Sequence, residues 1–264
     1  MLLPKIKALI LDMDGVMWKG DSPIGDLPAI FEHIRLLGLK YAFATNNGTR
    51  TPEQYVKRLE GFGLHIDPWQ VVTSSLGVAH LLAQKYPSGG PVFAIGEEGV
   101  LAALREKGFT PLSVEDAHQA QAVIMGIDHQ ICFEKMVEAA LLVRQGIPFF
   151  ATNPDKTFPT PRGEIPGAGA WISVIVTATG VEPVYAGKPS PYLIDLAVER
   201  LGTTKTSTLI VGDRLETDIA GGQAAGCPVA LVLSGVSSRE SGERWRPKVD
   251  LIAKDLAALV DFEE

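Results

Sequence analysis

The sequence predicts a protein of the α/β class that is built on a largely parallel sheet. Short apolar segments alternate with amphipathic helical segments along most of the 264 residues, which is the order of strands and helices in βα units. The apolar segments are hydrophobic at nearly every position, as expected for strands that helices cover on both faces. We therefore expect strands at residues 7–11, 40–44, 92–95, 122–126, 148–151 and 208–211.

The expected helices occupy the amphipathic segments, at residues 26–37, 51–61, 76–85, 98–107, 133–145, 190–201 and 217–225. The helix over 51–61 has a clear start signal, because Thr51 can cap its first turn and Pro52 fits the first helical position. Gly38 and Gly61 follow the last residues of two helices, where glycine commonly ends a helix. Residues 152–170 are rich in proline and glycine, and we expect a long irregular loop there.

The composition excludes several classes of protein. Hydrophobic residues make up 46% of the chain and charged residues 21%, which is typical of a soluble globular protein and not of a disordered one. The net charge of −7, from 24 Lys and Arg against 31 Asp and Glu, disfavours a protein that binds the nucleic-acid backbone. The two cysteines, Cys132 and Cys227, are too few for a disulfide framework.

No segment predicts a membrane span or a secretory signal. Lys5, Lys7 and Asp12 interrupt the first apolar segment, so it lacks the long apolar region of a signal peptide. The longest nearly uncharged stretch, residues 165–181, is shorter than the ~20 apolar residues that cross a bilayer, and we interpret it as a buried helix. We therefore expect a cytoplasmic protein that has neither a membrane nor a nucleic-acid partner.

Two carboxylates follow the first expected strand. The segment 6–15 reads IKALILDMDG and places Asp12, Asp14 and Gly15 at the end of that strand. Ligands of open α/β sheets bind outside the carboxyl ends of the strands, where two carboxylates can act as a nucleophile, an acid and base, or ligands of a hard cation. The alternative is that Asp-x-Asp-Gly is an ordinary turn after a strand.

The second expected strand runs into Thr45-Asn46-Asn47-Gly48. A hydroxyl and two amides at a strand end can donate several hydrogen bonds to phosphate oxygens. The alternative is again a turn, because Asn-Gly is a common turn pair.

Further charged residues occur near two later helix starts. Asp213 follows the apolar strand over 208–211, in the same position as Asp12, and Asp218 lies in the next helical turn, where it can also cap the helix. Lys188 precedes a helix and can hold an anion beside the free N–H groups of that helix, although a lone lysine is more often a solvated charge. Together, these carboxylates, the lysine and the neutral donors match the requirements of phosphoryl transfer.

The order of these motifs resembles that of the haloacid dehalogenase-like (HAD) superfamily of phosphotransferases, which use an aspartate nucleophile. The segments TNNGTRTPEQYVKRL (45–59), AGKPSP (186–191) and GDRLETDIAGGQAAG (212–226) are similar to the branch that contains nitrophenylphosphatases, phosphoglycolate phosphatases and NagD-type phosphatases. The resemblance extends over essentially the whole chain. It implies a Mg²⁺-dependent enzyme that hydrolyses small phosphate monoesters.

The resemblance also implies a role for each residue of the motifs. Asp12 would be the nucleophile that forms an aspartyl phosphate, and Asp14 the general acid for the leaving group and then the base for water. Mg²⁺ would be bound by Asp12, by the backbone carbonyl of Asp14 and by Asp213, with Asp218 supporting the metal and the lysine. The implied phosphate ligands are Thr45, Asn46, Asn47 and Lys188.

The family places a large α/β cap between the second and third motifs. The resemblance therefore implies a Rossmann-like, parallel-sheet core at residues 1–74 and 185–264 and an inserted cap domain at residues 75–184. The loop around Asn153 and Asp155 resembles the family's cap loop that faces the substrate, and the alternative is an irregular surface loop. Relatives commonly form homodimers through the cap, so the resemblance also allows a homodimer.

The expected substrate is a small phosphorylated metabolite: a sugar phosphate, a nucleoside monophosphate, phosphoglycolate or an aryl phosphate. Two alternatives remain. A phosphotransferase or phosphomutase would use the same residues with an alcohol in place of water as the acceptor. A catalytically weak protein that binds a phosphorylated metabolite would not need a nucleophile and an acid two residues apart.

Overall fold

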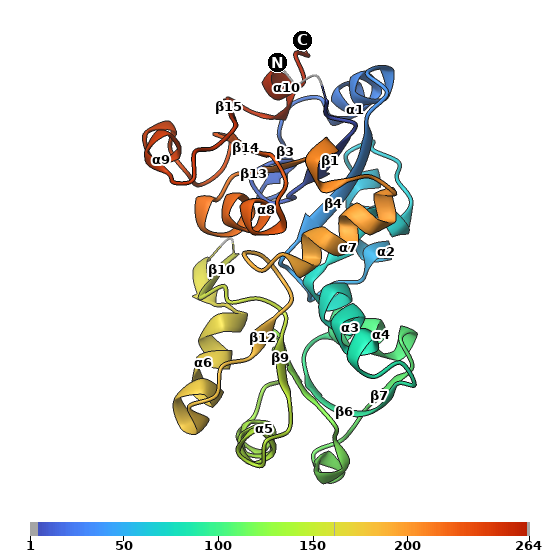
Figure 1. Cartoon of the computed structure of the whole chain (residues 1–264), viewed down its shortest axis with the longest axis vertical. Helices are drawn as coiled ribbons and strands as arrows, with labels where there is room; N and C mark the ends of the chain where they lie inside the picture. The colour runs from blue at the N-terminus through green and yellow to red at the C-terminus, as the bar shows by residue number, and fades with distance from the viewer. Residues whose placement is uncertain (1–4, 161, 263–264) are drawn as a thin grey trace. The chain divides into compact units, whose positions relative to one another are not determined.

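A computed structural model of the chain describes residues 5–160 and 162–262 (Figure 1). It divides into two compact units, of which the first comprises Met1–Thr45, Pro52–Val72 and Lys188–Glu264 and the second comprises Asn46–Thr51 and Thr73–Gly187. The chain therefore passes between the units at four points. Each unit contains a parallel sheet with helices, so the expected α/β class is confirmed.

The first unit is built on a six-stranded sheet in the order β15-β14-β13-β1-β4-β5. Strand β1 pairs in parallel with both β13 and β4, so Leu11 lies beside Val211 on one side and Phe43 on the other. The carboxyl ends of these three strands consequently meet at one edge of the sheet. The strands are β1 (Ala8–Leu11), β4 (Lys40–Thr45), β5 (Val71–Thr73), β13 (Thr208–Gly212), β14 (Val229–Val232) and β15 (Leu251–Ala253).

Helices cover both faces of this sheet. Leu9 and Leu11 of β1 belong to the same buried cluster as Phe31 of α1, whereas Gly222 of α8 lies against Ile210 on the opposite face. Alternate residues of each strand are thus buried by different helices, which explains the continuous apolar character of the strands. The helices are α1 (Leu27–Leu36), α2 (Pro52–Glu60), α7 (Tyr192–Leu201), α8 (Ala220–Ala225), α9 (Arg239–Arg244) and α10 (Leu256–Leu259), and a short hairpin joins β2 (Trp18–Lys19) to β3 (Ser22–Pro23).

The second unit contains a five-stranded parallel sheet in the order β12-β9-β8-β6-β7. Phe93 of β6 and Phe149 of β9 pack with Ile172 of α6, and the ring of Phe150 faces Lys85 of α3. The strands are β6 (Gly90–Ile95), β7 (Phe109–Pro111), β8 (Val123–Met125), β9 (Phe149–Ala151) and β12 (Val184–Tyr185). The helices are α3 (Ser74–Lys85), α4 (Glu98–Glu106), α5 (Phe133–Arg144) and α6 (Ala168–Thr179).

The region 152–170 is more regular than the sequence suggested. It contains an antiparallel hairpin of β10 (Thr157–Thr160) and β11 (Gly163–Pro166), after which α6 begins. The expectation of an irregular loop was wrong, because both strands of an isolated hairpin are edge strands and edge strands tolerate proline. The expected buried helix over 165–181 starts later and is only half-buried, since Val174 of α6 is 48% exposed.

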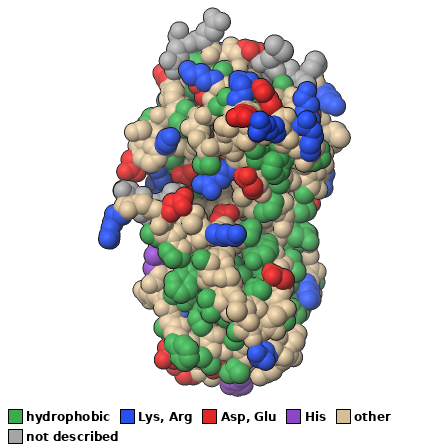
Figure 2. Space-filling model, turned by 90° about the vertical axis from the view of Figure 1, so that its left-hand side faces the viewer, with side chains coloured by type: hydrophobic (Ala, Val, Ile, Leu, Met, Phe, Trp, Pro, Cys, Tyr) green, Lys and Arg blue, Asp and Glu red, His purple; other side chains and the backbone are tan. Residues whose placement is uncertain are grey.

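Exposed apolar side chains are frequent on the second unit. Figure 2 shows hydrophobic side chains in its lower half, and the exposed residues of α5 and α6 include Phe133, Leu141 and Val174.

Within residues 5–160 and 162–262, no helix has the length and apolar character needed to cross a membrane.

Candidate active site

The candidate catalytic residues of the first unit lie where three neighbouring strands end. Asp12 follows β1, Asp213 follows β13, and Thr45 is the last residue of β4. The parallel pairing of the three strands brings these positions to one edge of the sheet. The position of each residue therefore follows from the topology.

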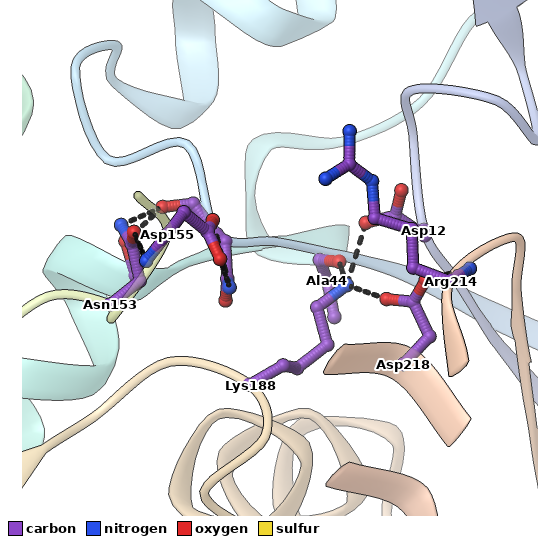
Figure 3. A network of polar contacts seen from close by, with 9 residues as sticks. Asp12, Ala44, Asn153, Asp155, Lys188, Arg214 and Asp218 are labelled. Atoms are coloured by element: carbon purple, nitrogen blue, oxygen red, sulfur yellow. Dashed lines mark hydrogen bonds and ion pairs between the residues drawn. The ribbon is translucent and has the colours of Figure 1, made fainter. Parts of the chain in front are cut away.

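Lys188 links two of the carboxylates. Its buried ammonium group donates to Asp12 Oδ1 at 2.6 Å, to Asp218 Oδ1 at 2.6 Å and to the carbonyl oxygen of Ala44 at 2.8 Å (Figure 3). Asp218 lies in a short π-helix, Leu215–Ile219, that precedes α8. Its second oxygen accepts from the backbone N–H of Arg214 at 3.0 Å. The three N–H bonds of the ammonium group are thus directed at three oxygens, which fixes the side chain.

Burial and neighbouring charges determine the electrostatics of this cluster. Burial raises the pKa of the Asp12 carboxyl well above its ordinary value; the ammonium of Lys188 lowers it, and the carboxylates of Asp218 and Asp213 raise it further. Burial lowers the pKa of Lys188, but Asp12 and Asp218 outweigh this effect and the net pKa is raised. Lys188 is therefore positively charged at neutral pH.

The two carboxylate oxygens of Asp213 differ in their hydrogen bonding. Oδ2 accepts from the backbone N–H of Val236 at 2.7 Å, whereas Oδ1 is buried without a hydrogen-bond partner among the described residues. Burial, followed by the charge of Asp218, raises the pKa of Asp213 to about 6. Gly15 adopts a φ of +83°, and a Cβ there would lie 2.6 Å from the Asp213 carboxyl carbon, so any side chain at this position would displace the carboxylate.

The carboxylate oxygens of this cluster are suitable ligands for a hard divalent cation. Asp12, Asp213 and Asp218 each offer an oxygen atom, and these atoms lie within 4.8 Å of one another. Carboxylate and carbonyl oxygens are the preferred ligands of Mg²⁺, and the unbonded, buried Asp213 Oδ1 is the atom that a cation would satisfy. Asp218 is less available, because both its oxygens already accept hydrogen bonds.

Asp14 differs from Asp12 in being exposed. Its Oδ1 accepts from the indole N–H of Trp18 at 2.7 Å. Trp18 is itself fully buried, so it holds this carboxylate in a fixed direction while leaving it accessible. An accessible, oriented carboxyl group is suited to proton transfer.

Three of the remaining predicted residues, Asn46, Asn153 and Asp155, form a cluster within the second unit. The side-chain amide of Asn46 donates to Asp155 Oδ2 at 3.1 Å, and the side-chain amide of Asn153 donates to the carbonyl oxygen of Asn46 at 2.7 Å. Asn47 uses its side-chain oxygen to accept from the N–H and hydroxyl of Thr49. The structure thus groups Asp12, Lys188, Asp213 and Asp218 in one unit and Asn46, Asn153 and Asp155 in the other.

The sequence analysis did not identify Trp18 or Ser74. Trp18 contacts Asp14 across a tight turn in which the N–H of Gly15 donates to the Trp18 carbonyl. The hydroxyl of Ser74 donates to the carbonyl of Asn46. The only sequence signal for Trp18 is its spacing of four residues from Asp14, and Ser74 has none, because its contact joins distant segments.

The chain is similar to known proteins over nearly its whole length. A haloacid dehalogenase-like hydrolase family model matches residues 9–110, and a second, HAD-hydrolase-like family model matches residues 185–259. The acid sugar phosphatase of Staphylococcus aureus is 35% identical over 263 residues, which are 99% of this chain and 100% of that protein.

Solved structures show the same similarity. The p-nitrophenyl phosphatase from Archaeoglobus fulgidus superimposes with a TM-score of 0.89 at 34% identity, over 98% of this chain and 99% of that one. The glycerol phosphate phosphatase from Mycobacterium tuberculosis, solved in complex with magnesium, gives a TM-score of 0.90 at 34% identity, over 98% of this chain and 78% of that one.

Proposed function

Because the chain belongs to the haloacid dehalogenase-like hydrolases, in the branch of the nitrophenylphosphatases and NagD-type phosphatases, we propose that it hydrolyses small phosphate monoesters through an aspartyl phosphate and requires Mg²⁺. The observation that carries the proposal is the cluster at the sheet edge. A carboxylate at a strand end, Asp12, contacts a charged lysine and lies beside the unbonded oxygen of Asp213.

The substrate class follows from the relatives. The similar proteins are named acid sugar phosphatase, p-nitrophenyl phosphatase and glycerol phosphate phosphatase, so a phosphorylated sugar or polyol is the first substrate to test. Nucleoside monophosphates, phosphoglycolate and aryl phosphates are further members of the panel.

In the first step, an oxygen of the Asp12 carboxylate attacks the phosphorus atom and the bond between phosphorus and the ester oxygen breaks. Asp14 donates its proton to the departing alkoxide. Trp18 supports this role by orienting Asp14 with a hydrogen bond to Oδ1. The products are an aspartyl phosphate at residue 12 and an alcohol.

In the second step, the ionised Asp14 removes a proton from water. The oxygen of this water attacks the phosphorus atom, and the bond between phosphorus and the Asp12 oxygen breaks. Inorganic phosphate leaves, the Asp12 carboxylate is restored and Asp14 is protonated again. The pair thus returns to its starting state.

Lys188 and Thr45 bind the phosphate group in this mechanism, together with Asn46 and, as a further candidate, Asn47. The ammonium of Lys188 lies 2.6 Å from Asp12 Oδ1 and therefore provides positive charge next to the oxygen that attacks. Asp218 keeps this lysine in position through its own 2.6 Å contact.

Mg²⁺ would be held by Asp12, by the backbone carbonyl of Asp14 and by Asp213. When bound, it supplies positive charge that neutralises the phosphate oxygens in the transition state. The unbonded Asp213 Oδ1 supports this assignment.

Release of phosphate from p-nitrophenyl phosphate and from a panel of metabolites tests the proposal. We expect release with Mg²⁺, none with EDTA, and a loss of at least about 10³-fold in Asp12→Asn, because the amide is not a nucleophile. Asp116→Asn, at an exposed carboxylate of the second unit, is the matched control and should retain activity. Full activity in Asp12→Asn would exclude the covalent mechanism.

Adding glycerol as an acceptor separates hydrolysis from phosphoryl transfer. A phosphatase releases inorganic phosphate whether or not glycerol is present, whereas a phosphotransferase forms glycerol phosphate at the expense of inorganic phosphate. If the protein binds the esters without turnover in either assay, it is a binding protein.

The assignment of the first unit as catalytic core and of the second as cap is part of the same proposal. The expected boundaries at residues 74 and 184 are close to the unit limits at 72 and 187, whereas residues 46–51, expected in the core, group with the second unit. The homodimer also stays a prediction. Exposed residues of the second unit such as Phe133 and Val174 are available for it, and light scattering of the purified protein tests it.

A further inference from the structure

The chain passes between the two units at four points, which we call crossing points. Residues near three of them lie together in one cluster of the second unit. Asn46 is the first residue of this unit and Gly187 the last. The carbonyl oxygen of Asn46 accepts from the hydroxyl of Ser74 at 2.6 Å and from the side-chain amide of Asn153 at 2.7 Å. We call Asn46, Ser74, Asn153, Asp155 and Gly187 the crossing cluster.

Asp155 holds the side chain of Asn46. Both its carboxylate oxygens lie within reach of the Asn46 amide nitrogen, at 3.1 and 3.3 Å. The N–H of Asp155 donates to Asn153 Oδ1 at 3.1 Å, which closes the loop (Figure 3). A hydrogen bond to an ionised acceptor is about twice as strong as one between neutral groups, so Asp155 provides a strong contact for the Asn46 carboxamide.

Backbone atoms of Gly187 lie against the other side of the Asn46 carboxamide. A Cβ at Gly187 would lie 2.6 Å from Asn46 Oδ1, so only glycine leaves room for this oxygen. The N–H of Gly187 donates to the carbonyl of Thr152 at 2.6 Å. The loop Thr152–Asp155 therefore contacts the segment that enters the second unit and also the segment that leaves it.

We propose that Asp155 is a positioning residue, whose carboxylate fixes Asn46 and, through Asn46, the segments that enter and leave the second unit. Its carboxylate does not contact the substrate. This assignment rests on the proposed function, in which Thr45 and Asn46 bind phosphate, because a displaced Asn46 would then impair every phosphate ester equally.

Kinetics with different leaving groups test this role. We expect Asp155→Ala to lower kcat/KM by about tenfold to a hundredfold, the range that corresponds to one hydrogen bond to a charged group, and by the same factor for p-nitrophenyl, glycerol and sugar phosphates. Asp155→Asn keeps an oxygen that can accept from Asn46 and should recover most of the activity. Asp116→Ala is the matched control for loss of a carboxylate in the same unit and should be unaffected.

Hydrogen exchange gives a readout that does not depend on activity. The N–H of Gly99 donates to the carbonyl of Thr49 at 3.2 Å, and it therefore reports whether segment 46–51 stays attached. In Asp155→Ala we expect faster exchange at Gly99 and Gly187, and no change in Asp155→Asn or Asp116→Ala. If Asp155→Ala does not fold, Asp155→Ser, whose hydroxyl is too short to reach Asn46, replaces it.

A loss of activity that differs between leaving groups, with unchanged exchange at Gly99 and Gly187, would overturn the proposal and make Asp155 a substrate contact. Unchanged activity together with unchanged exchange would overturn it as well. If the wild-type protein hydrolyses no ester, the proposed function fails, and exchange at Gly99 and Gly187 alone decides whether Asp155 fixes Asn46.

Discussion

Asp213 makes the stability of the metal-free protein depend on pH. Its pKa is about 6 in the folded protein, against an ordinary value of 3.8. A raised pKa means that the stabilising contribution is fully present below pH ~4 and is lost as the pH rises through about 6. The difference between the two pKa values corresponds to about 3 kcal/mol.

We therefore expect the free energy of unfolding of the wild-type protein in EDTA to fall by up to about 3 kcal/mol between pH 4 and pH 7, relative to Asp213→Asn. Urea denaturation of both proteins across this range measures the difference. Saturating Mg²⁺ should suppress the fall, because a bound cation favours the ionised carboxylate. Parallel curves for the two proteins in EDTA would contradict the assigned pKa.

Lys188 neutralises the partly buried carboxylate of Asp12 and the buried carboxylate of Asp218, so its removal should destabilise the protein. The side chains of Lys188 and Asp218 are 3% and 2% exposed. Lys188→Met leaves the charges of Asp12 and Asp218 unpaired, so we expect the free energy of unfolding to fall by about 3–5 kcal/mol. The double variant Lys188→Met/Asp218→Asn should be more stable than Lys188→Met alone. Urea denaturation of the two variants measures this difference in the free energy of unfolding. An additive, further loss in the double variant would mean that Lys188 does not neutralise Asp218.

Individual elements show where the sequence is informative and where it is not. Strands β1, β4 and β13 are continuous apolar segments that end in polar residues, so both the strands and the candidate residues at their ends were predictable. The hairpin of β10 and β11 was not, because the residues of β11 are all exposed and the segment carries no apolar periodicity. The contact between Asn46 and Asp155 joins residues 109 positions apart, and no local pattern specifies such a pair.

The start of α1 provides a prediction about a single element. Asp26 caps this helix by accepting from the N–H of Ala29 at 3.1 Å. Asp26→Ala should lower the free energy of unfolding by about 1 kcal/mol, whereas Asp26→Ser should keep most of the stability because serine also caps helices. Asp21→Ala is a suitable control, because Asp21 is 99% exposed and its ion pair with Arg58 is long, at 3.7 Å. An equal loss in Asp26→Ser and Asp26→Ala would exclude capping as the cause.

At the scale of the whole molecule, we expect Mg²⁺ to stabilise the first unit and to leave the second unit unchanged. The proposed ligands Asp12, Asp14 and Asp213 belong to the first unit, as does Asp218. A ligand that binds only the folded state raises stability by about 2.7 kcal/mol at 100 times its Kd. Hydrogen exchange with and without Mg²⁺ should therefore slow in β1 and β13 and stay unchanged in β6 and β8. Loss of the effect in Asp213→Asn locates the ion, and protection of β6 would contradict this site.

The order of strands has a consequence for synthesis on the ribosome. Strand β1 lies between β4 and β13, and β13 follows the whole second unit in the chain. A nascent chain that ends near Gly187 already contains all five strands of the second sheet, whereas the partner of β1 on one side has not yet been made. The second unit can therefore fold during translation while β1 keeps an open edge, which is the kind of edge that promotes aggregation. The contact between Asp12 and Lys188 can form only after synthesis has passed residue 188.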